Sequence, residues 1–154
     1  MKARKKPYSK RSDADKLPTN WRKTLGLLER SEFSMAIIRA GTCAEIAANI
    51  VVRAELIQRR QLEAAFVDTL LYWANGLQGK FSRLILPILA GTPRYAKFRK
   101  LQRSIQVLNN ARDEIAHTGS FAKSATARKL IFVAHALCTA LTRPYEVDLH
   151  LPKP

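Results

Sequence analysis

The first third of the chain contains the run Gly41-Thr-Cys-Ala-Glu-Ile-Ala-Ala-Asn-Ile50, which decides the fold. The run has no proline, and its apolar residues recur at helical spacing. It belongs to a longer segment, 32–59, that is unusually rich in small residues: Ala36, Ala40, Gly41, Ala44, Ala47, Ala48 and Ala54. Small side chains let neighbouring helices approach closely. The segment therefore predicts one long helix at the centre of a helical bundle.

Further helices are expected on both sides of this segment. Their approximate ranges are 21–30, 62–75, 81–89, 93–117 and 125–143. Pro87 should break or bend the segment 81–89. Thr118-Gly119 should end the segment 93–117, and Pro144 should end the segment 125–143. We see no internal repeat and no β-hairpin pattern. The expected fold is all-α, an antiparallel bundle of four to five helices.

The two ends of the chain lack the apolar helical periodicity that predicts the bundle. Residues 1–20 carry seven basic and two acidic residues, so we expect a flexible basic tail, either an arm that lies along phosphates or a solubilising tail. The bundle should span 21–145, and 146–154 should form a short C-terminal tail.

The net charge indicates the kind of partner. Twenty-seven Lys and Arg against 12 Asp and Glu give +15 at pH 7, which favours nucleic acid first and an acidic protein or membrane surface second. Cys43 and Cys138 lie in apolar helical patterns, so two buried thiols in a reducing cytoplasm are expected. We see no signal peptide, and the apolar stretch 131–141 is too short for a membrane span. A cytoplasmic protein without metal or cofactor is therefore expected.

The most informative polar cluster ends the segment 93–117. Arg112 follows Leu108 by four residues and so points along the apolar stripe, where a guanidinium is costly unless it is paired or borders a cleft. Asp113 lies four residues before His117 and could orient or acidify its imidazole. From spacing alone, His117 could equally be a capping histidine and Arg112 an arginine satisfied by a core acid.

The run Arg112-Asp-Glu-Ile-Ala-His117, followed by Thr-Gly, resembles the Arg-x4-6-His motif of the HEPN superfamily (higher eukaryotes and prokaryotes nucleotide-binding domain). In that family the motif ends a long helix of an all-α bundle. The residue after Arg is commonly Asn, Asp or His, and an apolar-Ala pair often precedes the His. The resemblance covers about 31–143, including the small-residue helix before the motif and the amphipathic helix after it.

This resemblance implies metal-independent RNA cleavage in a toxin or defence component, with Arg112 and His117 catalytic and Asp113 supporting them. RNA supplies its own nucleophile, the 2′-hydroxyl, so a histidine that moves protons and an arginine that stabilises the phosphorane would suffice. Many such domains are homodimers whose Arg–His pairs face one another. On an ideal helix Arg112 and His117 diverge, so we expect His117 to use a frayed helix end.

Two polar residues of the small-residue helix allow two interpretations. Glu45 and Asn49 could support the site, or form a buried polar pair in which Glu45 binds Arg112. Gly119 stands where toxins controlled by nucleotidyltransferases often have a modified Tyr, which argues against that form of control.

The stretch from Thr69 to Arg112 contains no acidic residue, which indicates a surface for RNA. Tyr95 and Phe98 could stack bases there, although the core is the expected place of Phe98. The same basic residues could instead form an ordinary solvated helix face. The candidate RNA-binding residues are Arg94, Lys97, Arg99, Lys100, Arg103 and Asn110.

Two alternatives to a nuclease remain. One is a non-catalytic HEPN-like domain that binds RNA or ribosomes through its basic face. The other is a regulator similar to the mannitol operon repressor family, which has an Arg-x-x-x-Ala-His run followed by Phe (compare Phe121). The expected partners are RNA, a second copy of the chain and an acidic antitoxin or regulatory protein, with no membrane.

Overall fold

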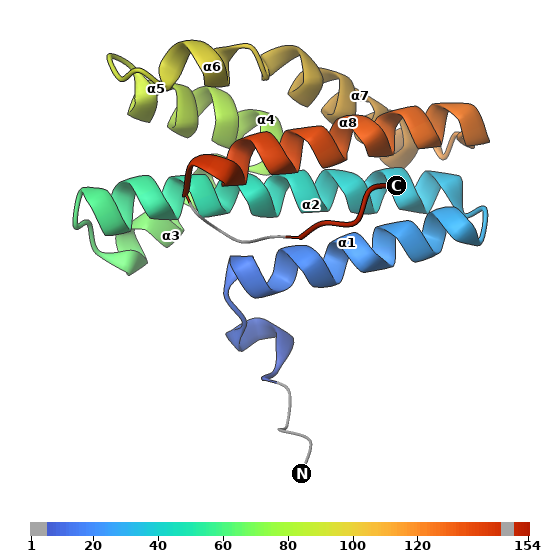
Figure 1. Cartoon of the computed structure of the whole chain (residues 1–154), viewed down its shortest axis with the longest axis horizontal. Coiled ribbons are helices and arrows are strands. Elements are labelled where there is room, and N and C mark those ends of the chain that lie inside the picture. Colours follow the sequence, from blue (N-terminus) through green and yellow to red (C-terminus); the bar gives the residue numbers. More distant parts are fainter. Residues whose placement is uncertain (1–5, 146–149) are drawn as a thin grey trace.

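A computed structural model of the chain describes residues 6–145 and 150–154 and confirms the all-α class. Helix α2 (Phe33–Arg53) continues as a π-helical segment, Ala54–Arg59, and lies at the centre of the bundle. Helix α1 (Asp13–Glu29) packs on one side of α2 and helix α8 (Ser124–Thr142) on another (Figure 1). Most of α2 is buried, so the small-residue segment is the centre of the fold as expected.

The middle of the chain forms shorter helices that cover the remaining surface of α2. They are α3 (Ala64–Trp73), α4 (Gly76–Lys80), a π-helical segment (Phe81–Ile85), α5 (Leu86–Leu89), α6 (Tyr95–Arg99) and α7 (Gln102–Thr118). Short 3-10 turns cover Tyr8–Lys10 and Arg143–Tyr145. Within the described ranges there is no β-strand.

Helix α1 begins earlier than the sequence predicted, so residues 13–20 belong to the bundle and not to a tail. Ser12 and Asp15 form a reciprocal capping box at its start. Leu17 is fully buried against the core, which stabilises this first part of the helix. Pro18 lies inside the helix, although it forfeits a backbone hydrogen bond there. The capping box and the burial of Leu17 outweigh that loss.

Two further boundaries differ from the prediction. The expected helix over 93–117 is divided at Lys100–Leu101 into α6 and α7, because Leu101 donates a backbone hydrogen bond to Phe98 in a tighter turn. The expected helix over 62–75 is shorter, because α3 ends at Trp73 and a separate helix, α4, begins at Gly76. Gly119 does cap α7 in the left-handed conformation, with φ +65°.

The apolar interior bears out the expected state of the thiols. Cys43 and Cys138 are both buried and free, and burial raises the pKa of Cys43 to about 11. Phe98 is core, with 1 % of its surface exposed. One helix, Phe33–Arg59, is long and apolar enough to cross a membrane by length and composition, and 67 % of its apolar window is buried inside the bundle, as in a core helix.

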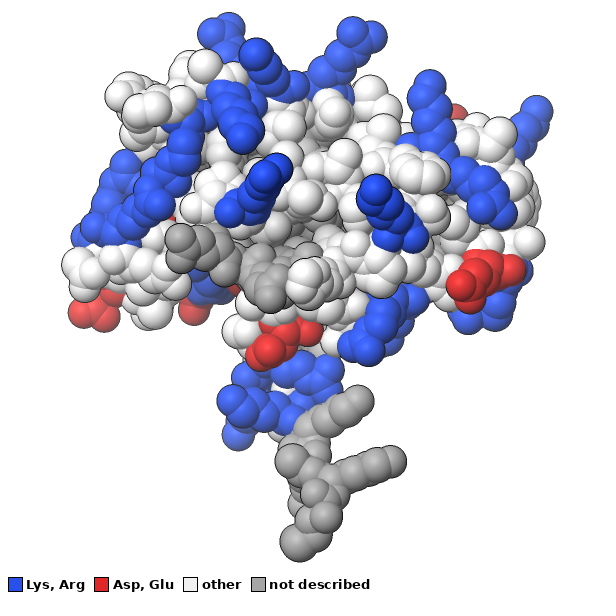
Figure 2. All heavy atoms as spheres, viewed as in Figure 1, with Lys and Arg blue, Asp and Glu red and all other residues white. Residues whose placement is uncertain are grey.

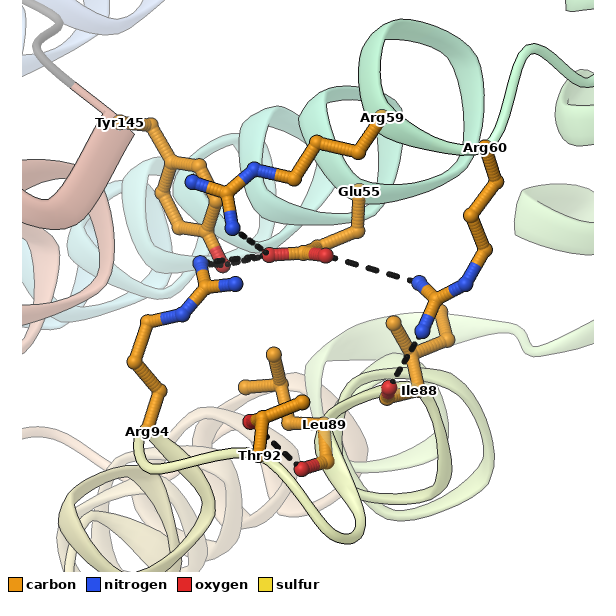
Figure 3. A network of polar contacts seen from close by, with 8 residues as sticks. All are labelled: Glu55, Arg59, Arg60, Ile88, Leu89, Thr92, Arg94 and Tyr145. Atoms are coloured by element: carbon orange, nitrogen blue, oxygen red, sulfur yellow. Dashed lines mark hydrogen bonds and ion pairs between the residues drawn. The ribbon is translucent and has the colours of Figure 1, made fainter.

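One end of the bundle is closed by a buried carboxylate, Glu55, which the sequence analysis did not single out (Figure 3). Its Oε1 lies 2.6 Å from Arg94 Nη1 and accepts a 2.9 Å hydrogen bond from the Tyr145 hydroxyl. Arg59 and Arg60 approach the same carboxylate at 3.4 and 3.5 Å. The cluster ties the end of the central helix to the segment before α6 and to the end of α8.

The last described residues, 150–154, lie against α1 and α8. The Trp21 indole N–H donates to Pro152 O at 2.7 Å, and His135 Nε2 lies 2.9 Å from Leu151 O. The rings of Trp21 and His135 are 5.4 Å apart. His135 is therefore a structural residue that links α8 to the end of the chain described by the structure. The remainder of the predicted C-terminal tail, 146–149, lies outside the described residues.

Candidate functional site: a polar cleft at the end of helix α7

Arg112 and His117 border the same open cleft, which has a volume of about 430 Å³. Three parts of the fold form it: α2, the turn from α3 into α4, and the second half of α7. The residues that line it are Glu45, Asn75, Gly76, Gln78, Asn109, Arg112, Asp113, Ala116 and His117. The structure thus brings together four of the predicted site residues: Glu45, Arg112, Asp113 and His117.

Arg112 crosses from α7 onto α2 at a position where α2 has no side chain. A Cβ added to Gly41 would lie 2.8 Å from Arg112 Cδ, so only glycine leaves room for the arginine stem. The arginine keeps 30 % of its side chain exposed at the cleft. Among the described residues it makes no hydrogen bond, so its N–H donors are available to an oxyanion.

Glu45 carries the charge that holds Arg112 in place. Its Oε2 lies 3.6 Å from Arg112 Nη1, and its Oε1 accepts a 2.5 Å hydrogen bond from Lys80 Nζ. Lys80 is the more buried cation, with 9 % of its side chain exposed. The predicted pairing of Glu45 with Arg112 is confirmed. Two cations share one carboxylate, so this group of three carries a net positive charge.

His117 lies in the last turn of α7, which continues to Thr118, and not on a frayed end as expected. Its side chain is exposed at the cleft. Asp113, expected to orient it, accepts a 2.9 Å hydrogen bond from Asn109 Nδ2 instead. In the part of the chain that the structure describes, no hydrogen bond or ion pair reaches the imidazole, which leaves it free to contact a ligand.

Asn49 does not line the cleft. Its Oδ1 is buried without a hydrogen-bond partner among the described residues. Three residues that line or support the cleft were not predicted as part of a site: Lys80, Gln78 and Asn109. Lys80 was visible only as one of the basic residues in the acid-free stretch, because nothing local in the sequence links it to Glu45.

The candidate RNA-binding residues have different surroundings. Arg94 is engaged with Glu55 and donates a 3.0 Å hydrogen bond to the Tyr145 hydroxyl. The other five are exposed: Lys97, Arg99, Lys100, Arg103 and Asn110. Lys and Arg side chains spread over much of the face seen in Figure 2, with few Asp and Glu between them. This charge distribution suits a polyanion.

The chemistry available in the cleft is acid–base and electrostatic. Among the residues described, no group of three or more His, Cys, Asp or Glu is arranged to hold a metal ion. Comparison with protein-family models, curated proteins and solved structures gives no significant match to this chain. The resemblance to the HEPN superfamily therefore rests on the motif and the helix order alone.

Proposed function

We propose that the chain is a metal-independent endoribonuclease of the HEPN type, with Arg112 and His117 as its catalytic pair. The observation that carries the proposal is that both side chains border one open cleft, although they are five residues apart on one continuous helix. Arg112 presents guanidinium donors at that cleft, where they can bind the oxygens of a phosphodiester, and Lys80 shares the carboxylate of Glu45 beside it.

The reaction follows from the groups at hand. The imidazole of His117 takes the proton of the 2′-hydroxyl, whose oxygen attacks the adjacent phosphorus. Arg112 donates to the phosphorane oxygens as their charge increases. The bond from phosphorus to the 5′-oxygen breaks, a general acid protonates that oxygen, and the products carry a 2′,3′-cyclic phosphate and a 5′-hydroxyl.

One histidine cannot hold both proton-transfer roles at the same moment. A second copy of the chain, facing the first across the cleft, would supply a second His117 as the general acid. A cytoplasmic homodimer acting as a toxin or defence component is thus the assembly that this mechanism favours. An acidic partner protein would neutralise the same basic face.

A non-catalytic RNA-binding or regulatory protein, similar to the mannitol operon repressor family, is the second candidate. The observation that favours it is the contact of Arg112 with Gly41 and Glu45, since these contacts give the arginine a structural role without any chemistry.

Cleavage of RNA in EDTA distinguishes the two. We expect the wild type to give 2′,3′-cyclic phosphate ends, and His117→Ala and Arg112→Ala to lose at least about 100-fold in rate. Arg128→Ala, an exposed arginine on α8, is the matched control and should cleave normally. Folded protein that binds RNA but cleaves none would leave the second candidate.

A further inference from the structure

A second hollow, of about 490 Å³, adjoins the Arg112–His117 cleft. Its lining includes Tyr72, Trp73 and Lys80, and it shares Glu45 and Asn75 with the cleft. An extended ligand bound in one hollow can therefore continue into the other.

The two aromatic rings at this hollow are strongly exposed. Tyr72 has 82 % and Trp73 69 % of its surface accessible, at the C-terminal end of α3. Large aromatic side chains contribute far more stability when buried than when left in water. Two neighbouring exposed rings on one helix end therefore suit contact with a ligand better than they suit the fold.

The backbone beneath these rings is tightly fixed. A Cβ at Gly79 would lie 1.7 Å from the carbonyl oxygen of Ala74, so α4 packs directly on the end of α3. Asn75, between the two helices, has φ +27°, which a residue other than glycine rarely adopts. The turn thus holds Trp73 at a set position relative to Lys80 and Glu45.

We propose that Tyr72 and Trp73 form a stacking platform for an unpaired base of single-stranded RNA whose phosphate occupies the Arg112–His117 cleft. Exposed aromatic rings beside cations are the combination that binds single strands, because each base offers a π-face and each nucleotide a phosphate. The chain's net charge of +15 attracts the phosphates of such a strand to this part of the surface. The inference rests on the proposed function only for what the neighbouring cleft binds.

Tryptophan fluorescence reports on this platform almost directly. Of the two tryptophans, Trp21 is fully buried and Trp73 is exposed. We would titrate the full chain with an uncleavable 2′-O-methyl oligouridylate and with an abasic oligomer of the same phosphate count. The base-bearing oligomer should quench Trp73 and bind tighter than the abasic one, by about 5- to 100-fold.

Variants separate stacking from charge. Trp73→Ala and Tyr72→Ala should each lose most of the preference for the base-bearing oligomer but keep the salt dependence of binding, which phosphate contacts set. Trp73→Phe should retain most of the affinity, because a π-face remains. Phe132→Ala, an exposed aromatic on α8 (54 %), is the matched control and should change the affinity less than about twofold.

Three results would overturn the platform: equal affinity for the base-bearing and abasic oligomers, unchanged affinity in Trp73→Ala, or dissociation of a dimer by Trp73→Ala with RNA affinity intact. The last would assign the rings to a second copy of the chain. The nuclease proposal fails separately: a protein whose Trp73 is quenched by RNA but which cleaves none keeps the platform and loses the catalysis.

Discussion

Gly41 on α2 and Arg112 on α7 are in direct contact, and the absence of a Cβ at position 41 creates the path that the arginine follows to the cleft. The atom that a Cβ would meet is Cδ, in the middle of the side chain, which cannot move without displacing the guanidinium. The position of Arg112 is therefore set by a residue on another helix.

Gly41→Ala should displace Arg112 and abolish most RNA cleavage, although alanine favours helix more than glycine does. Overpacking at this contact should also cost about 1–3 kcal/mol in the free energy of unfolding. Gly26→Ala on α1 is the matched control, because its Cβ would meet only the flexible end of Arg30 at 3.4 Å. That variant should be neutral or more stable by about 0.5–1 kcal/mol. Urea unfolding and the EDTA cleavage assay measure both effects, and full activity in Gly41→Ala would contradict the prediction.

Glu45→Gln should destabilise the protein, because it leaves Lys80 and Arg112 without their shared counter-charge. With Lys80 almost buried, we expect a loss of about 1–3 kcal/mol in the free energy of unfolding. Glu32→Gln removes the exposed pair with Arg30 and should cost less than about 1 kcal/mol. Equal losses in the two variants, measured by urea unfolding, would show that Glu45 has no special role in the cleft.

Glu55→Gln should be among the most destabilising single substitutions in the chain. It leaves three arginines, Arg59, Arg60 and Arg94, around a buried neutral amide, and breaking a buried ion pair costs about 3–5 kcal/mol. The measurement is again urea unfolding. A loss near that of an exposed carboxylate would mean that water or rearrangement compensates the cluster.

Tyr145 should make the protein less stable in alkali. Burial, and then the hydrogen bond to Glu55, raises the pKa of Tyr145 well above its ordinary value. The unfolded phenol loses its proton above about pH 10 while the folded one keeps it, so stability present below that pH decreases as the pH increases further. Tyr145→Phe should therefore lose less stability between pH 9 and 12, about 1–3 kcal/mol less. Tyr72→Phe, at an exposed position, should follow the wild type.

The sequence predicted those parts of the fold that depend on local pattern. The small residues of 32–59 predicted the central helix, and Gly119 predicted the end of α7. The start of α1 was missed because Pro18 is usually a sign of a helix start, whereas here Leu17 and the capping box of Ser12 stabilise an earlier one.

The candidate site was only partly predictable for a similar reason. Arg112 and His117 belong to one short motif, so both could be predicted from the sequence. Glu45 with Lys80, and Glu55 with Tyr145, are 35 and 90 residues apart, and only the packing of the bundle joins them. Periodicity identifies a face of a helix, but it does not identify the charge that another helix places opposite that face.

The central position of α2 has a consequence for synthesis. Helix α1, made before α2, covers one side, but the side that α8 covers must wait until residues 124–142 have left the ribosome. Until then a nascent chain carries a long apolar helix with one face open to water. The face of α2 that α8 covers is therefore enclosed only after translation has passed through every helix between them.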